Sequence, residues 1–144
     1  MQRSRHGQFA ANLCPITSSN GLVPSNVRVT ATTVERFAGV TIDAAEERYR
    51  SPLVQSARDL EPRLGAATRV ILLGSVATEK YVDPLMECFS DRLLFPSDFV
   101  GRGDMSRGGL LLRAVKEGRE LAYQQLSAVT MRTGKRPPKL GPKQ

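Results

Sequence analysis

The chain has 144 residues, a net charge of +7, and 40% hydrophobic and 24% charged residues, which suits one folded globular domain. No stretch approaches the ~20 apolar residues that cross a membrane, and an aromatic content of 6% argues against a stacking platform for single-stranded nucleic acid. One histidine and two cysteines are too few for a zinc-finger-type site, so we expect no bound metal. We also expect no cofactor, no membrane partner and a cytoplasmic location.

The first part of the chain carries weak structural signals. Residues 1–26 are rich in Gly, Ser, Asn and Pro and show little hydrophobic periodicity, which predicts an irregular N-terminal arm. Apolar and polar residues alternate over 27–33, which predicts a half-exposed strand. The stretch 34–40 remains ambiguous.

Two helix-start signals follow. Glu46 and Glu47 would lie near the positive end of a helix that begins shortly after residue 41. Ser51-Pro52 is a second start signal, because serine caps helices and proline suits their first position. The helix is predicted to end at about residue 64, or earlier at Pro62.

The strand with the strongest signal is 69–73. It is short, apolar and rich in β-branched residues, as in a strand that is buried on both faces. Gly74 and Ser75 follow as turn residues, and a helix is predicted over about 77–89. Within it, Pro84 either kinks the helix or restarts it.

The second half of the chain repeats this order. A second short strand is predicted over 92–95, and 97–109 is predicted to be a loop because it is dense in Gly, Asp, Ser and Arg. A helix over about 107–117, with Ser106 as its cap, is favoured over a hairpin in the same place. A last strand is predicted over 120–126.

These elements predict a single α/β domain over 27–126 with a three- to four-stranded, mostly parallel or mixed sheet. The remaining residues, 127–144, hold five basic residues and no acid, so the other 126 residues carry a net charge of +2 (+7 less +5). Proline and glycine in this tail predict disorder. The tail is either a solvated terminus or a nucleic-acid-binding segment that acts by counterion release. Its candidate contacts are Arg132, Lys135, Arg136, Lys139 and Lys143.

The turn after the first α/β strand is a candidate anion site. Open α/β sheets bind ligands beyond the carboxyl ends of their strands, where free N–H groups and the helix dipole attract negative charge. We predict that Gly74, Ser75 and Thr78 cradle a phosphate group. The turn matches neither the phosphate-loop nor the dinucleotide fingerprint, so the alternative is an ordinary strand-to-helix connection.

A second candidate lies in the stretch 101–109, which contains four glycines and two arginines. Arginine forks bind phosphate or carboxylate oxygens, and aspartates can accept protons. The predicted ligand contacts are Arg102, Ser106 and Arg107, and the predicted catalytic residues are Asp98 and Asp104. The alternative is a flexible turn in which Arg102 and Asp104 pair with each other.

The two candidates form one site if the strands 69–73 and 92–95 are parallel neighbours, which a helical crossover between them predicts. Both loops would then leave the same sheet edge. This gives two functional hypotheses: a domain, either an enzyme or not, that handles a nucleotide or phosphorylated small molecule, and a non-enzymatic nucleic-acid-binding or interaction module that acts through its basic tail.

Overall fold

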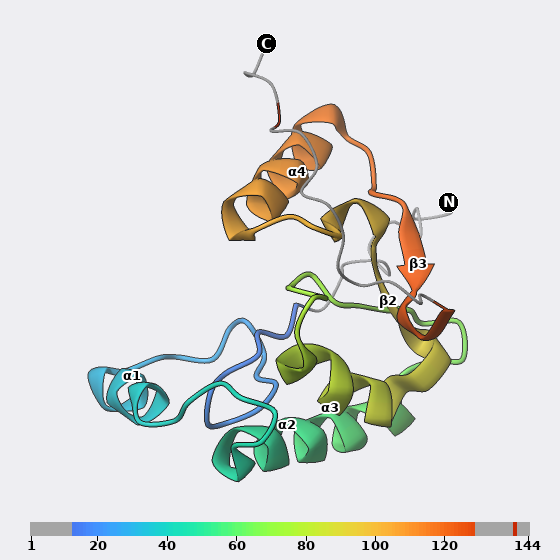
Figure 1. Ribbon diagram of the computed structural model, residues 1–144. Helices are drawn as coiled ribbons and strands as arrows, with labels where there is room; N and C mark the ends of the chain where they lie inside the picture. Colours follow the sequence, from blue (N-terminus) through green and yellow to red (C-terminus); the bar gives the residue numbers. More distant parts are fainter. Residues whose placement is uncertain (1–12, 129–139, 141–144) are drawn as a thin grey trace, which may run out of the picture.

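The computed structural model describes residues 13–128 and 140, which form a mixed domain of helices and a small sheet (Figure 1). This confirms the α/β prediction. With 3₁₀ helices labelled η, the elements are α1 (Ala31–Ala38), α2 (Glu47–Leu60), η2 (Glu61–Arg63), β1 (Val70–Ile71), α3 (Glu79–Phe89), η3 (Ser90–Arg92), β2 (Leu93–Pro96), η4 (Ser97–Phe99), α4 (Asp104–Glu117), β3 (Tyr123–Gln125) and η5 (Leu126–Ala128).

The sheet has three strands in the order β1-β2-β3. Strand β1 runs parallel to β2, with Val70 opposite Leu93, and α3 makes the crossover between them. Strand β3 runs antiparallel to β2, with Phe95 opposite Gln124. The sheet is therefore mixed, and the predicted parallel pair is present.

The main core lies between the sheet and the packed helices α2 and α3, which run side by side (Figure 1). Tyr49, Leu53 and Ala57 are buried at every fourth position of α2, which places them on one face. The buried residues of this main core are Tyr49, Leu53, Ala57, Leu72, Val76, Val82, Leu85, Phe89, Leu93, Phe95 and Leu126. A separate small cluster under α4 contains Phe99, Leu110, Ala114 and Leu121.

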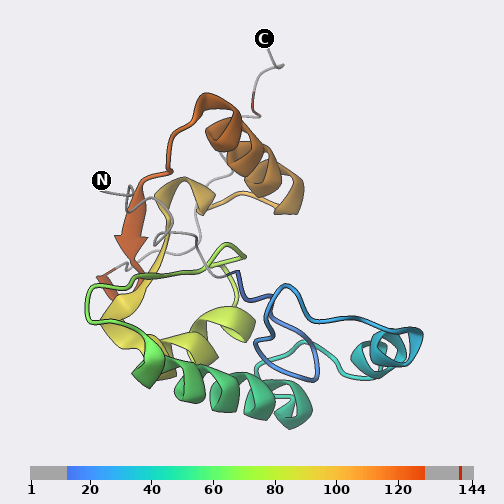
Figure 2. The same ribbon diagram turned by 180° about the vertical axis from the view of Figure 1, so that it is seen from behind.

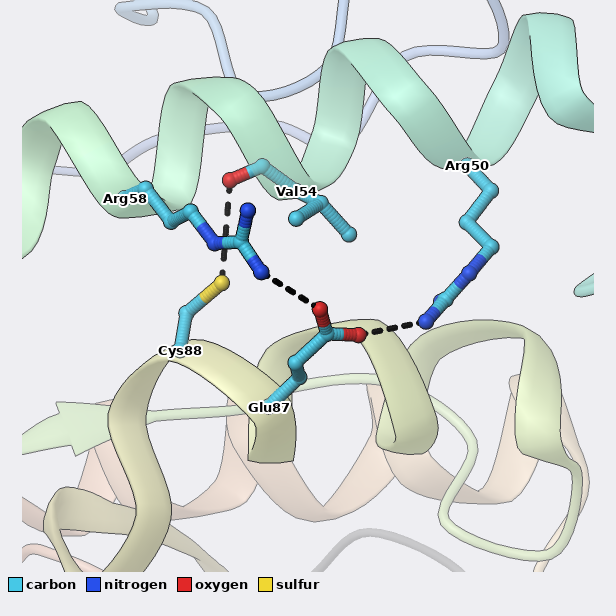
Figure 3. A network of polar contacts seen from close by, with 5 residues as sticks. All are labelled: Arg50, Val54, Arg58, Glu87 and Cys88. Atoms are coloured by element: carbon cyan, nitrogen blue, oxygen red, sulfur yellow. Dashed lines mark hydrogen bonds and ion pairs between the residues drawn. The ribbon is translucent and has the colours of Figure 1, made fainter.

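A polar network joins the outer surfaces of α2 and α3 (Figure 3). Glu87 of α3 pairs with both Arg50 and Arg58 of α2, the latter at 2.7 Å. Beside it, Cys88 Sγ donates to the Val54 carbonyl oxygen at 3.6 Å. Burial raises the pKa of the Cys88 thiol, so it stays protonated at neutral pH and is a poor nucleophile.

The strand predicted over 27–33 is wrong. Helix α1 begins at Ala31, and Thr30 caps it: the Thr30 side chain accepts from the Thr33 N–H, and the Thr33 side chain accepts from the Thr30 N–H. This capping box satisfies two backbone groups locally. No described strand lies beside residues 27–30, so alternation alone could not make a strand there.

The helix start predicted at Ser51-Pro52 is also wrong, because α2 begins at Glu47 and Pro52 lies inside it. The Glu46 side chain caps this helix by accepting from the Arg48 N–H at 3.3 Å. The helix ends at Leu60, two residues before Pro62 and so earlier than either predicted end, and a 3₁₀ turn over Glu61–Arg63 follows it.

A second internal proline is accommodated by a partner that is distant in sequence. Helix α3 runs from Glu79 to Phe89 with Pro84 inside it, and proline has no N–H to offer the carbonyl four residues earlier, that of Lys80. The Tyr49 hydroxyl of α2 donates to that carbonyl oxygen at 2.6 Å. Tyr49 is fully buried, so it both fills the core and provides a hydrogen bond that Pro84 cannot.

Part of the predicted N-terminal arm packs on α2. Residues 13–25 fold back as a ribbon in which Ile16 and Leu22 form an antiparallel bridge. The buried Gly21 lies at the turn with a φ of +66°, and the Leu22 N–H donates to Ser56 Oγ of α2 at 2.9 Å. Within the described residues, no helix is long and apolar enough to cross a membrane.

Candidate functional site

The predicted site lies at the edge where β1 and β2 end. The segment 72–78 follows β1, and the segment 97–103 follows β2. Because the two strands are parallel neighbours, their carboxyl ends face the same way. Both segments therefore start from one edge of the sheet.

The turn after β1 is anchored by Leu72 and Val76, whose side chains are buried. The fold does not require glycine at position 74, because a Cβ there would make only ordinary contacts, 3.5 Å from Leu72 Cδ1 and 3.9 Å from Tyr81 Cδ2.

The hydroxyl groups of this turn have no partner among the described residues. Thr78 is the N-cap residue of α3, is exposed, and makes no capping hydrogen bond through its side chain. Ser75 is half-buried and likewise has no hydrogen bond within the described part of the chain. The first N–H groups of α3 cannot pair within the helix, so hydroxyl and amide donors gather at this end.

The stretch after β2 differs from its prediction. It was expected to be a loop up to residue 109, but α4 begins at Asp104. Gly103, which has no side chain with which to cap the helix, is the N-cap residue, so the prediction that Ser106 caps the helix is wrong. Burial of Leu110 and Ala114 against Phe99 offsets the helix penalty of the two glycines. The helix preferred for this region is confirmed, with Gly118 ending it in the left-handed conformation.

Arg102 and Arg107 form hydrogen bonds to other residues of this same segment. Arg102 donates through Nε to the Asp98 carbonyl oxygen at 2.9 Å and through Nη1 to Ser106 Oγ at 3.0 Å. Arg107 donates to the Arg102 carbonyl oxygen at 2.6 Å and pairs with the Asp104 carboxylate. The alternative pairing of Arg102 with Asp104 is therefore replaced by the pair Arg107–Asp104.

These contacts leave Arg102 and Arg107 with different capacities to contact a ligand. The Arg107 side chain is only 12% exposed, whereas Arg102 is half-buried and uses two of its five N–H donors in these bonds. Asp98 and Asp104 are both exposed.

Sequence reasoning missed the part that Tyr49 plays in holding α3. Its bond to the Lys80 carbonyl oxygen fixes the first turn of α3, which begins one residue after Thr78. The Lys80 side chain leans over the Tyr81 ring, with Nζ 5.1 Å from the ring centroid. No sequence signal links Tyr49 with residues 31 positions further along the chain.

The predicted tail contacts Arg132, Lys135, Arg136, Lys139 and Lys143 lie outside the described residues. In the part of the chain that the structure describes, no group of three or more His, Cys, Asp or Glu side chains could hold a metal ion. Comparisons of the chain with protein-family models, with curated proteins and with solved structures find no match.

Proposed function

We propose that this chain binds a phosphate-bearing small molecule, such as a nucleotide, at the shared edge of β1 and β2. The observation that carries the proposal is the parallel pairing of these strands, which brings the segments 72–78 and 97–103 to one side of the sheet. Edges of this kind are where α/β sheets bind ligands.

The donors at this edge suit a phosphate group. The Ser75 and Thr78 hydroxyls and the first amides of α3 can donate to phosphate oxygens, and the unused Arg102 donors can add a charged contact. The negative charge of Glu79 disfavours binding of a phosphate, but the positive charge of Lys80 follows it in the first turn of α3. The two charges offset each other. We therefore expect binding to be modest.

Titration with ATP, ADP and inorganic phosphate tests the proposal. We expect a dissociation constant on the order of 0.1 mM for at least one of them by calorimetry. The double variant Ser75→Ala/Thr78→Ala should weaken binding by about tenfold or more, because each lost hydrogen bond contributes about 1 kcal/mol. The control Thr41→Ala removes another exposed threonine and should leave the affinity unchanged.

Two results would contradict this function: no binding of any of the three ligands, or equal affinity in the wild type and the double variant. Perturbation of backbone amide signals confined to segments other than 72–81 and 97–103 would place the ligand elsewhere and would contradict it as well.

The second candidate function is binding of nucleic acid through the tail, which the five basic residues among 127–144 favour. Deleting residues 132–144 is expected to abolish the binding of a duplex DNA probe and its dependence on salt, because counterion release scales with the phosphates neutralised. Phosphate binding at the sheet edge should persist in the truncated chain. Unchanged DNA binding after truncation would exclude the tail as the contact.

A further inference from the structure

Helix α4 is held in place mainly by one small group of side chains. It lies apart from α2 and α3 (Figures 1 and 2), and among the described elements no other helix or strand packs extensively along it. Its buried side chains, Leu110 and Ala114, belong to the small cluster with Phe99 and Leu121. Because this cluster buries far less apolar area than the main core, each further side chain that joins it adds substantially to its stability.

Leu140 supplies such a side chain from the C-terminal tail. It is half-buried and packs against the small cluster. Its Cδ1 atom lies 3.2 Å from the position that a Cβ at Gly109 would occupy, so it rests on the bare backbone of α4. A Cβ at the neighbouring Gly108 would meet no atom within 4 Å. Of these two glycines, only Gly109 makes room for another side chain.

The position of Arg102 depends on α4. Phe99 of the segment 97–103 belongs to the small cluster, and Arg102 of the same segment donates to Ser106 Oγ of α4 at 3.0 Å. In return, Arg107 of α4 donates to the Arg102 carbonyl oxygen at 2.6 Å. Both contacts are with the first turn of α4. A displacement of α4 would therefore move Arg102 relative to the sheet edge.

We propose that Leu140 is a latch: by packing at Gly109 it holds α4 and Arg102 in place, and it thereby controls ligand binding at the edge of β1 and β2. The control of binding rests on the function proposed above, whereas the latch does not. Regions of a protein open locally when few apolar contacts hold them. Removing the Leu140 contacts should therefore populate an open form of α4 while the main core stays folded.

Amide hydrogen exchange of the full chain without ligand tests the latch. In Leu140→Ala we expect the amides of α4 to exchange at least about fivefold faster, because a half-buried leucine loses most of its apolar contacts. The amides of α2 and α3 should keep their rates. Leu140→Met conserves the side-chain volume and should exchange like the wild type. Unchanged exchange of α4 in Leu140→Ala, or equal acceleration in α2, would overturn the latch.

Gly109→Gln and Gly108→Gln form a matched pair. Both replace a glycine inside α4 and gain the same helix propensity, but only the side chain at position 109 crowds Leu140. We expect α4 to exchange about threefold faster in Gly109→Gln than in Gly108→Gln. Adding Leu140→Ala to both variants should remove this difference, since the crowded partner is then absent. Equal rates in the two single variants would also overturn the latch.

ATP tests the control of the site. If the open form lacks the Arg102 contact and binds ATP about tenfold more weakly, ATP at about ten times its dissociation constant should slow the exchange of α4 about fivefold. Helix α1, which lies away from this edge (Figure 1), should keep its rate. ATP binding without protection of α4 would overturn the control but not the proposed function. Absence of ATP binding would contradict that function and the control together, while the ligand-free experiments still decide the latch.

Discussion

Replacing Gly21 with alanine is expected to lower the free energy of unfolding by about 3 kcal/mol or more. Two costs combine at this position. The φ of +66° is unfavourable for a residue with a side chain, and the new Cβ would lie 2.3 Å from the Pro52 carbonyl oxygen and 2.5 Å from Ser56 Oγ. The ribbon of residues 13–25 would have to move away from α2, which would also break the bond between the Leu22 N–H and Ser56 Oγ.

Gly118→Ala is a matched control for this substitution. Gly118 has the same φ of +66°, but a Cβ there would meet no atom within 4 Å, so only the backbone cost of about 1 kcal/mol remains. Urea denaturation of both variants separates the two costs, since their difference measures the packing of the ribbon on α2. Equal losses of stability in the two variants would show that the close approach of Gly21 to α2 does not contribute to folding.

Local signals were sufficient for the order of elements at the centre of the fold. The strand predicted over 69–73 as buried on both faces is, however, only Val70–Ile71, which is half-buried at the edge of the described sheet. The apolar run 69–73 is followed by turn residues and a helical stripe, and this order predicts a strand, a crossover and a parallel neighbour. The structure confirms the parallel pair and the helix α4, which has Gly118 as its C-cap residue. The same reasoning placed the two candidate segments at one sheet edge, because that placement follows from strand direction alone.

The incorrect predictions concern residues whose structure depends on partners that are distant in the sequence. The alternating stretch 27–33 has the pattern of a strand but no neighbouring strand among the described residues, and the cap at Thr30 made a helix instead. The start of α4 at Asp104 depends on burial against Phe99 rather than on a capping side chain. The roles of Arg102 and Arg107 depend on which carbonyl groups lie within reach, and sequence spacing does not reveal that.

The clearest case is the contact between Tyr49 and Lys80. We expect Tyr49→Phe to cost about 2 kcal/mol at neutral pH, because it leaves the Lys80 carbonyl without the hydroxyl partner and with Pro84 unable to donate to it. In a Pro84→Ala background the new N–H can bond to that carbonyl, so the same substitution should cost less. A double-mutant cycle by urea denaturation measures this coupling, and a coupling energy of zero would contradict the role assigned to Tyr49.

The alkaline stability of the protein gives a second readout of the same side chain. Burial, with a smaller contribution from Tyr81, raises the pKa of Tyr49 above its ordinary value of 10. Above pH 10 the unfolded chain loses this proton while the folded chain keeps it. The contribution of the Tyr49 hydroxyl to the free energy of unfolding is therefore complete below pH 10. Above pH 10 it declines by about 1.4 kcal/mol for each pH unit.

The pKa values of Cys88 and Tyr123 are also raised by burial, so the wild type alone cannot assign the effect to one residue. The Tyr49→Phe variant keeps both of these groups but lacks the Tyr49 hydroxyl, and its stability should decline less steeply between pH 10 and 12. We expect the gap between wild type and variant to narrow by about 2 kcal/mol or more over this range. A gap that stays constant would mean that Tyr49 ionises in the folded protein, which its full burial and its bond to a carbonyl oxygen should prevent.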